Sequence, residues 1–520
     1  MIERDPAAYE PPCRLRLLSD YVDLYAATTP DAVAVIDGDR QLTYAELAAE
    51  VERIRGILAS LGITRGDRVA TLATPSWSYY VTMLATIGLG AIWVGLNPRY
   101  RYDEIAFIAR DCSPKAIFFL TKFEGRDYRP DFERLAREIG WAHLIALGTN
   151  GVGDIEGPAV GASTTERPAV ETMDAAVVVY TSGSSGRPKG ALLSHHGLIY
   201  GALAQHNRWR LPTVNQICFW PINHVGCVGD LSATTLVIGG TLTFQPRFDP
   251  KAVLDAIAGG RANVFLAVPT MLQLIMNDPA FTDESFAPIA FLVWGGAALP
   301  RPYIERLVAL CPRVATIYGM TEAAANTTYS DEGADVDVLF ESVGKPLPEF
   351  PTRIADGERV LGPGEPGEIQ HFGDYLTLGY FNQPEATRDA FTGDGWYRTG
   401  DVGFWRRDGN IQLVGRMKEM FKSGGYNVYP REIELAIEQH PAIVMAAVVS
   451  VPDPLYQEVG VAFVVPKSDE PLTAEALRVY CRERLANYKV PKRFVIRSEL
   501  PRLPIGKIDK VSLRTEAMGS

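Results

Sequence analysis

The feature that most constrains the fold is an apolar segment, Val177-Val178-Val179-Tyr180, which leads directly into Thr181-Ser182-Gly183-Ser184-Ser185-Gly186-Arg187-Pro188-Lys189-Gly190. Consecutive β-branched residues predict a buried strand. Glycines let the backbone approach a phosphate, hydroxyl and N–H groups donate to its oxygens, and a lysine adds positive charge. A Walker loop would need Gly before the lysine and Ser or Thr after it, and Lys189 has neither. The stretch therefore predicts a nucleotide-phosphate loop of another kind, with a flexible surface loop as the alternative.

Strands and helices alternate on both sides of this loop, which predicts an α/β fold with mostly parallel sheets. Residues 69–98 carry no charge and imitate a membrane span, but Pro75 and three glycines divide them into strand 69–73, helix 77–87 and strand 91–96. Two later segments, 292–298 and 314–322, end as strand-to-loop exits, where open α/β sheets bind ligands. Residues 344–414 predict a small β subdomain, and the last hundred or so predict a small α+β domain.

Composition limits the class of protein. The 520 residues exceed one small domain, and 47% are hydrophobic, which is enough for a large core. The net charge of −11 argues against nucleic acid as the main partner. Six scattered cysteines without a CxxC pair favour a reducing compartment and no structural metal. The charged start, Met1 to Asp5, does not resemble a signal peptide, so we expect a soluble, cytoplasmic protein without an integral membrane segment.

Four motifs, in the order in which they occur, are similar to those of one family. They are Thr181-Ser182-Gly183-Ser184-Ser185-Gly186-Arg187-Pro188-Lys189-Gly190, Tyr318-Gly319-Met320-Thr321-Glu322, Trp396-Tyr397-Arg398-Thr399-Gly400-Asp401 and Pro504-Ile505-Gly506-Lys507-Ile508-Asp509-Lys510. The chain thus resembles the adenylate-forming (ANL) enzymes, in the branch of AMP-forming acyl-CoA synthetases. The last motif departs slightly, since many members end it in Arg where this chain has Lys510.

The resemblance implies a site for ATP and Mg²⁺. The phosphates would lie on Thr181, Ser182, Gly183, Ser184, Ser185, Gly186 and Lys189. The adenine would lie on Gly296, Ala297, Ala298, Tyr318, Gly319 and Met320, and the ribose on Asp401 and Arg416. Thr321 would contact the α-phosphate and Glu322 would bind the metal, while Lys507 would bridge the phosphate and the acid. Taken alone, Tyr318 reads equally as a core tyrosine, Asp401 as a turn residue and Lys507 as a solvated lysine.

The resemblance also implies a mobile C-terminal domain. Lys418 stands at the position of the family's hinge, which divides the chain into residues 1–417, the adenylation domain, and residues 418–520. The loop after it, Lys422, Ser423, Gly424, Gly425 and Tyr426, would bind coenzyme A. Glycines permit the torsion changes that a domain rotation requires. A basic surface hairpin is the alternative interpretation of this segment.

The acid pocket would be formed by His224, Val225, Gly226, Trp294, Gly295 and Ala323. Amino-acid-activating members carry an aspartate where this chain has Val225, which argues against an α-amino acid. The small residues Gly226, Cys227, Gly229 and 323–325 suggest room for a bulky apolar acid, and aryl, alicyclic or polycyclic, and medium-chain acids all remain open.

The implied activity is formation of an acyl-adenylate and pyrophosphate, followed by transfer of the acyl group to the thiol of coenzyme A. Two alternatives remain: a ligase that loads the phosphopantetheine of a carrier protein supplied in trans, and a non-catalytic ATP-binding homologue. His224, Thr321, Glu322 and Lys507 are the expected catalytic residues. The expected partners are a carboxylic acid and coenzyme A, in a monomer or homodimer.

Overall fold

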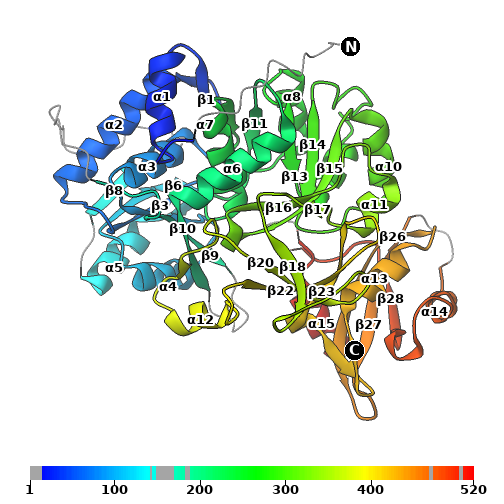
Figure 1. Ribbon diagram of the computed structural model, residues 1–520. Helices are drawn as coiled ribbons and strands as arrows, with labels where there is room; N and C mark the ends of the chain where they lie inside the picture. Colours follow the sequence, from blue (N-terminus) through cyan, green and yellow to red (C-terminus); the bar gives the residue numbers. More distant parts are fainter. Residues whose placement is uncertain are drawn as a thin grey trace. The chain divides into compact units, whose positions relative to one another are not determined.

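The computed structural model describes residues 14–140, 143–147, 169–181, 188–467, 472–502 and 507–519 (Figure 1). The chain divides into two compact units, each assembled from separate segments. The first unit comprises Met1–Phe265, Gly319–Asn326 and Asp374–Asp389, and the second comprises Leu266–Tyr318, Thr327–Gly373 and Ala390–Ser520. All of residues 418–520 belong to the second unit, and the domain boundary after Met417 stays a prediction.

A seven-stranded sheet organises the first unit, in the order β21-β10-β9-β4-β3-β5-β8. Its strands are β3 (Arg68–Leu72), β4 (Ile92–Leu96), β5 (Ala116–Leu120), β8 (His143–Leu147), β9 (Ala175–Thr181), β10 (Lys189–Ser194) and β21 (Gly379–Tyr380). The five strands from β9 to β8 are parallel, which confirms the expected α/β class. Strand β10 pairs antiparallel with both β9 and β21, so β9 and β10 form a hairpin.

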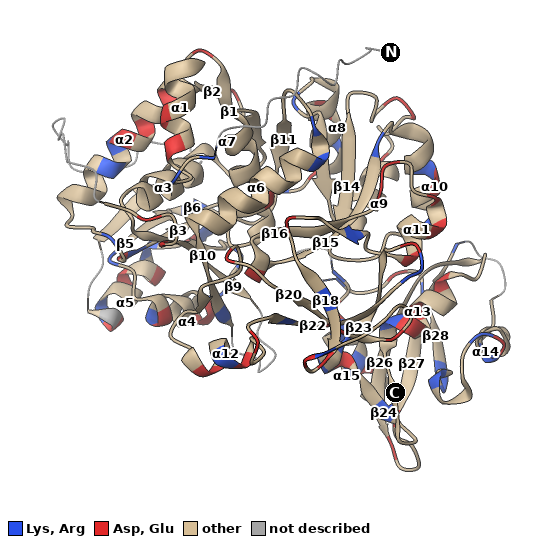
Figure 2. Ribbon diagram, in the orientation of Figure 1, with Lys and Arg blue, Asp and Glu red and all other residues tan. Residues whose placement is uncertain are grey.

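The helix between β3 and β4 explains the uncharged stretch of sequence. In α3 (Trp77–Gly88) every residue is buried, and the helix carries no Lys, Arg, Asp or Glu (Figure 2). The predicted strand–helix–strand unit is therefore confirmed. Within the described ranges, every helix is too short or too polar to cross a membrane.

The remaining elements of the first unit include a second sheet and most of the helices. The sheet has the order β11-β12-β1-β2. Its strands are β1 (Val33–Asp37), β2 (Arg40–Thr43), β11 (Asn215–Cys218) and β12 (Thr241–Phe244), and a small hairpin pairs β6 (Lys122–Phe123) with β7 (Arg126–Asp127). The helices are α1 (Asp20–Thr28), α2 (Tyr44–Ser60), α4 (Tyr102–Cys112), α5 (Arg129–Ile139), α6 (His195–Trp209), α7 (Thr234–Ile238), α8 (Pro250–Ala258) and α12 (Pro384–Asp389), with the π-helix η2 (Gly226–Ala233) and the 3₁₀ turn η3 (Thr321–Ala323).

The second unit contains two complete sheets and most of a third, whose residues 264–265, 319–320 and 325–326 belong to the first unit. They have the orders β13-β14-β15-β16-β17, β19-β18-β20-β22-β23 and β25-β24-β27-β26, and β28 pairs with β27. The first holds β13 (Val264–Ala267), β14 (Phe291–Gly295), β15 (Val314–Met320), β16 (Ala325–Tyr329) and β17 (Lys345–Pro346). The second is the predicted β subdomain, with β18 (Thr352–Asp356), β19 (Arg359–Val360), β20 (Gly367–His371), β22 (Tyr397–Trp405) and β23 (Ile411–Arg416). The third holds β24 (Phe421–Ser423), β25 (Tyr426–Val428), β26 (Ile443–Asp453), β27 (Gln457–Pro466) and β28 (Arg493–Ile496).

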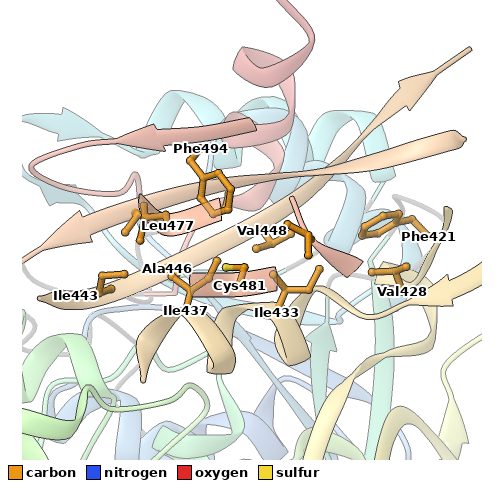
Figure 3. Packing of buried hydrophobic residues seen from close by; sticks show 13 residues of the cluster. Phe421, Val428, Ile433, Ile437, Ile443, Ala446, Val448, Leu477, Cys481 and Phe494 are labelled. Atoms are coloured by element: carbon orange, nitrogen blue, oxygen red, sulfur yellow. The ribbon is translucent and has the colours of Figure 1, made fainter. Parts of the chain in front are cut away.

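Helices cover both faces of the third sheet. The helices of the second unit are α9 (Pro269–Met276), α10 (Arg301–Leu310), α11 (Val336–Glu341), α13 (Pro430–Glu438), α14 (Ala474–Arg482) and α15 (Lys510–Gly519), with the 3₁₀ turns η4 (Met417–Glu419) and η5 (Asn487–Lys489). Successive residues of a strand point to opposite faces. Accordingly Ala446 and Val448 of β26 pack with α13 and α14, as Figure 3 shows, whereas Ala447 and Val449 belong to the cluster that includes Leu513 of α15.

Candidate active site

The second unit brings the predicted catalytic lysine to the predicted ribose-binding residues. Lys507 follows the undescribed residues 503–506, so Pro504, Ile505 and Gly506 lie outside the described residues. Burial and the neighbouring charge of Arg416 lower the pKa of Lys507, and Asp401 opposes them. A side chain on Gly296 would place its Cβ 3.7 Å from Cε of Lys507. Residues of three motifs, which together span more than two hundred positions of the sequence, thus meet in one place.

Asp401 is held from two sides. The hydroxyl of Tyr318 donates to its Oδ2 at 2.7 Å, and Nε of Arg416 lies 3.0 Å from its Oδ1. Burial raises the pKa of Tyr318, and the adjacent Asp401 adds to the shift. Tyr318 is the last buried residue of β15, and its hydroxyl orients Asp401 in addition to any role of its ring.

The glycine turn that the sequence assigns to adenine is open. Trp294 is fully buried, and a Cβ on Gly295 would lie 2.6 Å from Ile317, so both belong to the packed end of β14. The next three residues, Gly296, Ala297 and Ala298, are exposed. Gly296 has φ +79°, a left-handed conformation that favours glycine. In this motif Trp294 and Gly295 are therefore packed into the protein, and only the residues from Gly296 to Ala298 are accessible to a ligand.

The first unit brings the phosphate-loop lysine to the predicted metal ligand. Ser182, Gly183, Ser184, Ser185 and Gly186 lie outside the described residues, but Thr181 and Lys189 close the hairpin on either side. Nζ of Lys189 lies 5.0 Å from the ring centroid of Tyr380. The hydroxyl of the same tyrosine donates to Oε1 of Glu322 at 2.8 Å. Tyr380 therefore links the two motifs, although nothing in the sequence marked it.

The turn that carries Glu322 is a tight one. Thr321 begins η3, and its carbonyl accepts from the N–H of Ala324 at 3.0 Å. Ala324 has φ +57°. Glycines of the neighbouring helices contact this turn, because a Cβ on Gly201 would lie 2.5 Å from Ala325 and one on Gly229 would lie 2.7 Å from the Ala324 carbonyl. Gly319 and Met320, which precede the turn, are half-buried.

Three of the residues predicted for the acid, His224, Val225 and Gly226, lie at the start of the π-helix η2. His224 is half-buried, accepts from the N–H of Gly226 at 3.0 Å, and has its ring 5.5 Å from that of Trp220. Val225 and Ala323 are buried. A Cβ on Gly226 would lie 2.4 Å from Trp220. The space that Gly226 and Gly229 leave is thus filled by Trp220 and the Ala324 turn, so these glycines do not themselves supply room for an acid.

The predicted hinge and coenzyme A loop follow β23. Lys418 is exposed in the middle of η4. Strands β24 and β25 form a hairpin in which Gly424 and Gly425 have φ +58° and +86°. Lys422 and Tyr426 are exposed, whereas Ser423 is buried. The ring of Tyr426 stacks on that of Tyr488, with 4.4 Å between the ring centroids. This places an aromatic face and a lysine on one accessible hairpin.

Comparison with known proteins identifies the family. Residues 22–381 match the family described as AMP-binding enzyme, and residues 432–507 match the AMP-binding enzyme C-terminal domain. The chain belongs to the AMP-binding enzyme family. It is 34% identical to the feruloyl-CoA synthase of Amycolatopsis over 94% of this chain and 96% of that protein. It is 32% identical to the indoleacetate–CoA ligase of Aromatoleum aromaticum over 96% of this chain and 97% of that one.

A solved structure agrees with this assignment. ATP-bound MatB from Rhodopseudomonas palustris superposes with a TM-score of 0.85 at 31% identity, covering 95% of this chain and 98% of that chain. The expected fold class and the assignment to the carboxylate–CoA ligase branch are confirmed. The individual roles of the site residues stay predictions.

One departure from the family motif has a structural explanation. Lys510 lies at the start of α15, and its Nζ is 2.8 Å from Glu434 and 3.2 Å from Glu419. Burial alone would lower the pKa of Lys510, but the two carboxylates raise it. In this AMP-binding enzyme, Lys510 therefore anchors the segment after Lys507 through ion pairs with Glu434 and Glu419.

A second feature that the sequence did not predict is a buried polar cluster beside the turn of Glu322. Asp230, in the middle of η2, accepts at Oδ1 from Gln205 at 3.2 Å and from Asn326 at 3.0 Å. Burial raises the pKa of Asp230 to about 7. Only the tertiary fold joins α6, η2 and β16, so no local sequence signal could have identified this cluster. π-Helical turns often occur at functional sites.

Asp230→Asn is expected to stabilise the protein more at pH 8 than at pH 5. The pKa of Asp230 is raised on folding, so between about pH 4 and pH 7 the folded state binds more protons, and stability falls as pH rises. The neutral amide removes this loss, which is of the order of 2 kcal/mol between about pH 5 and pH 8. Melting temperatures of both proteins across this range provide the test. The exposed Asp283→Asn serves as control, and a difference that does not change with pH would contradict the assignment.

Proposed function

We propose that this AMP-binding enzyme activates an apolar aryl or other bulky carboxylic acid with MgATP and transfers the acyl group to coenzyme A. The observation that carries the proposal is the meeting of Lys507, Asp401 and Arg416 beside the open Gly296 turn. A carboxylate and a guanidinium suit the two hydroxyls of a ribose, and a half-buried lysine suits an α-phosphate next to an acid carboxylate.

Tyr318, Gly319, Met320 and the 296–298 turn are proposed to hold the adenine, while Thr181, Lys189 and the 182–186 loop hold the phosphates. Thr321 contacts the α-phosphate. Lys507 neutralises charge as the acid carboxylate attacks that phosphate in line and pyrophosphate leaves. The chain contributes positioning and charge rather than a covalent intermediate. The resulting acyl-adenylate is the substrate of the second step.

The donor set around Glu322 fits Mg²⁺ that arrives with ATP. Mg²⁺ is commonly held by one or two carboxylates together with substrate phosphates and water. The described residues contain no cluster of three or more His, Cys, Asp or Glu side chains that could hold a metal ion. We propose that the metal has one protein carboxylate, that of Glu322, and is shared with the nucleotide. When bound, Mg²⁺ would neutralise phosphate charge. Glu322, oriented by Tyr380, would supply the carboxylate oxygen.

For the second step, we propose that the residues after Lys418 rotate, remove Lys507 and present the hairpin of Lys422, Ser423, Gly424, Gly425 and Tyr426 to coenzyme A. The exposed Tyr426 ring suits a base, and Lys422 suits a phosphate. The half-buried His224, together with Val225 and Ala323, is proposed to contact the acid. The relatives named for feruloyl and indoleacetate substrates support a planar aromatic acid.

A panel of acids assayed for pyrophosphate release, with and without coenzyme A, tests the proposal. Aryl acids are expected to give acyl-adenylate without coenzyme A and thioester with it. A carrier-protein ligase would give acyl-adenylate but no thioester with coenzyme A. Absence of pyrophosphate release with every acid would overturn the assignment as a ligase.

A further inference from the structure

A short segment of the first unit, Asp374–Asp389, joins the phosphate-loop hairpin to the turn of Glu322. Its strand β21 pairs with β10, where the N–H of Phe381 donates to the carbonyl of Gly190 at 2.8 Å. Just before β21, the N–H of Thr377 donates to the carbonyl of Glu322 at 2.6 Å. The backbone of this segment therefore fixes β10, which begins with Lys189, relative to Glu322.

The side chain of Tyr380 lies within this junction. Its hydroxyl donates to Oε1 of Glu322 at 2.8 Å, and Nζ of Lys189 lies 5.0 Å from the centroid of its ring. Among the described residues, neither Lys189 nor Glu322 forms an ion pair. The tyrosine thus contacts a cation with its ring and an anion with its hydroxyl.

The position of this tyrosine is itself constrained. The N–H of Tyr380 donates to Oγ1 of Thr387 at 2.9 Å. The hydroxyl of Thr387 in turn donates to the carbonyl of Gln383 at 2.9 Å. Gly379 has φ +125°, and a Cβ there would lie 2.7 Å from Thr387. Glycine is therefore required next to Tyr380, and the backbone that carries the ring is held in place.

We propose that Tyr380 is a positioning residue for adenylation. Its hydroxyl orients the carboxylate of Glu322 toward the metal, and its ring holds Lys189 for the phosphates. A direct ion pair would neutralise both groups against each other. A phenol donates to one oxygen while leaving the charge of the carboxylate, and a cation over a ring keeps its own charge. The inference rests on the proposed function, because it presumes that Glu322 binds Mg²⁺.

Tyr380→Phe removes the hydroxyl and keeps the ring. We expect the Mg²⁺ concentration for half-maximal acyl-adenylate formation to rise by roughly tenfold, since hydrogen bonds to charged groups have about this effect. The KM for the acid should not change, and thioester formation from supplied acyl-adenylate should proceed at the wild-type rate. Tyr380→Leu also removes the ring and should in addition raise the KM for ATP several-fold.

Binding measurements separate positioning from a general loss of activity. By isothermal titration, Tyr380→Phe should weaken binding of MgATP and leave binding of ATP in EDTA unchanged. Tyr128→Phe is the matched control, because the hydroxyl of Tyr128 donates to the carbonyl of Pro98 and Arg126 lies 4.6 Å from its ring centroid. A Mg²⁺ dependence of Tyr380→Phe equal to that of the control would overturn the proposal.

A double variant tests whether Tyr380 acts through Glu322. Glu322→Gln with Tyr380→Phe should show no further change in Mg²⁺ dependence beyond Glu322→Gln alone, and an additive change would overturn the proposal. If Glu322→Gln leaves the Mg²⁺ dependence unaltered, the proposed metal role of Glu322 fails first. Should Tyr380→Phe not fold, Thr387→Val releases the Tyr380 backbone and should shift the Mg²⁺ dependence in the same direction, and a wild-type response would overturn the proposal.

Discussion

Lys507→Ala is expected to slow acyl-adenylate formation by about 100- to 1000-fold, the usual effect of removing one group that stabilises transition-state charge. Thioester formation from supplied acyl-adenylate should survive. The direction of the pKa shift of Lys507 supports this expectation. Burial and Arg416 disfavour its positive charge, and Asp401 only partly opposes them. Bound anions would supply the missing negative charge, so this location suits a phosphate and a carboxylate.

The measurement follows each half-reaction in a single turnover. Lys467→Ala is a suitable control, because Lys467 is exposed at the end of β27. Lys510 would be a poor control, since its removal leaves the buried Glu434 with one partner fewer. Equal losses in both half-reactions would show that Lys507 does not act in adenylation alone.

Lys418→Pro is expected to preserve adenylation and to slow thioester formation from acyl-adenylate by roughly 100-fold or more, the scale of rate loss for misplaced reacting groups. Proline fixes φ near −65° and cannot follow a large torsion change. In the structure the exposed Lys418 lies in η4, between Arg416 and the β24–β25 hairpin that we propose binds coenzyme A. If the two half-reactions use two orientations, a stiff residue at this position should retain one of them.

The matched control is Lys418→Ala, which removes the side chain without restricting the backbone, and both half-reactions should then proceed at nearly wild-type rates. A melting curve for each variant shows whether proline merely destabilises the fold. A folded Lys418→Pro protein that makes thioester at the wild-type rate would exclude rotation about this residue.

Features encoded by neighbouring residues were predictable from the sequence. Thr43 and Glu46 predict a capping box, and the structure confirms it, with both hydrogen bonds present at the start of α2. The uncharged residues 69–96 predict a strand–helix–strand unit because glycines and a proline divide them, and this is also confirmed. Both signals are local, so tertiary contacts do not change them.

Features that depend on distant segments were not predictable. Gly226 and Gly229 suggest empty space, but Trp220 and the carbonyl of Ala324 occupy it. Close packing requires glycine at these two positions, so the absence of side chains there does not indicate how large the acid substrate is. Trp294 likewise belongs to the core of its strand. These residues were chosen for their sequence position, which does not show what packs against them.

The same limit applies to Tyr380 and Asp230. Tyr380 is separated from Glu322 by 58 residues, and Asp230 from Asn326 by 96. A single sequence gives no sign of contacts over such separations. The family motifs named the residues proposed to touch substrates, whereas the residues that orient them became visible only in the folded chain.

The segmented make-up of the first unit has a consequence for its biosynthesis. The turn of Glu322 belongs to Gly319–Asn326 and strand β21 to Asp374–Asp389, and both segments follow long after the main part ends at Phe265. At typical rates of translation, roughly 6 to 25 seconds pass between Phe265 and Asp389. During that interval β10 can pair with β9 but lacks β21, so its other edge is unpaired, which favours pairing with other chains. The nascent protein is therefore most exposed to misassembly while the ribosome completes these residues, and this is the stage at which a chaperone would protect it.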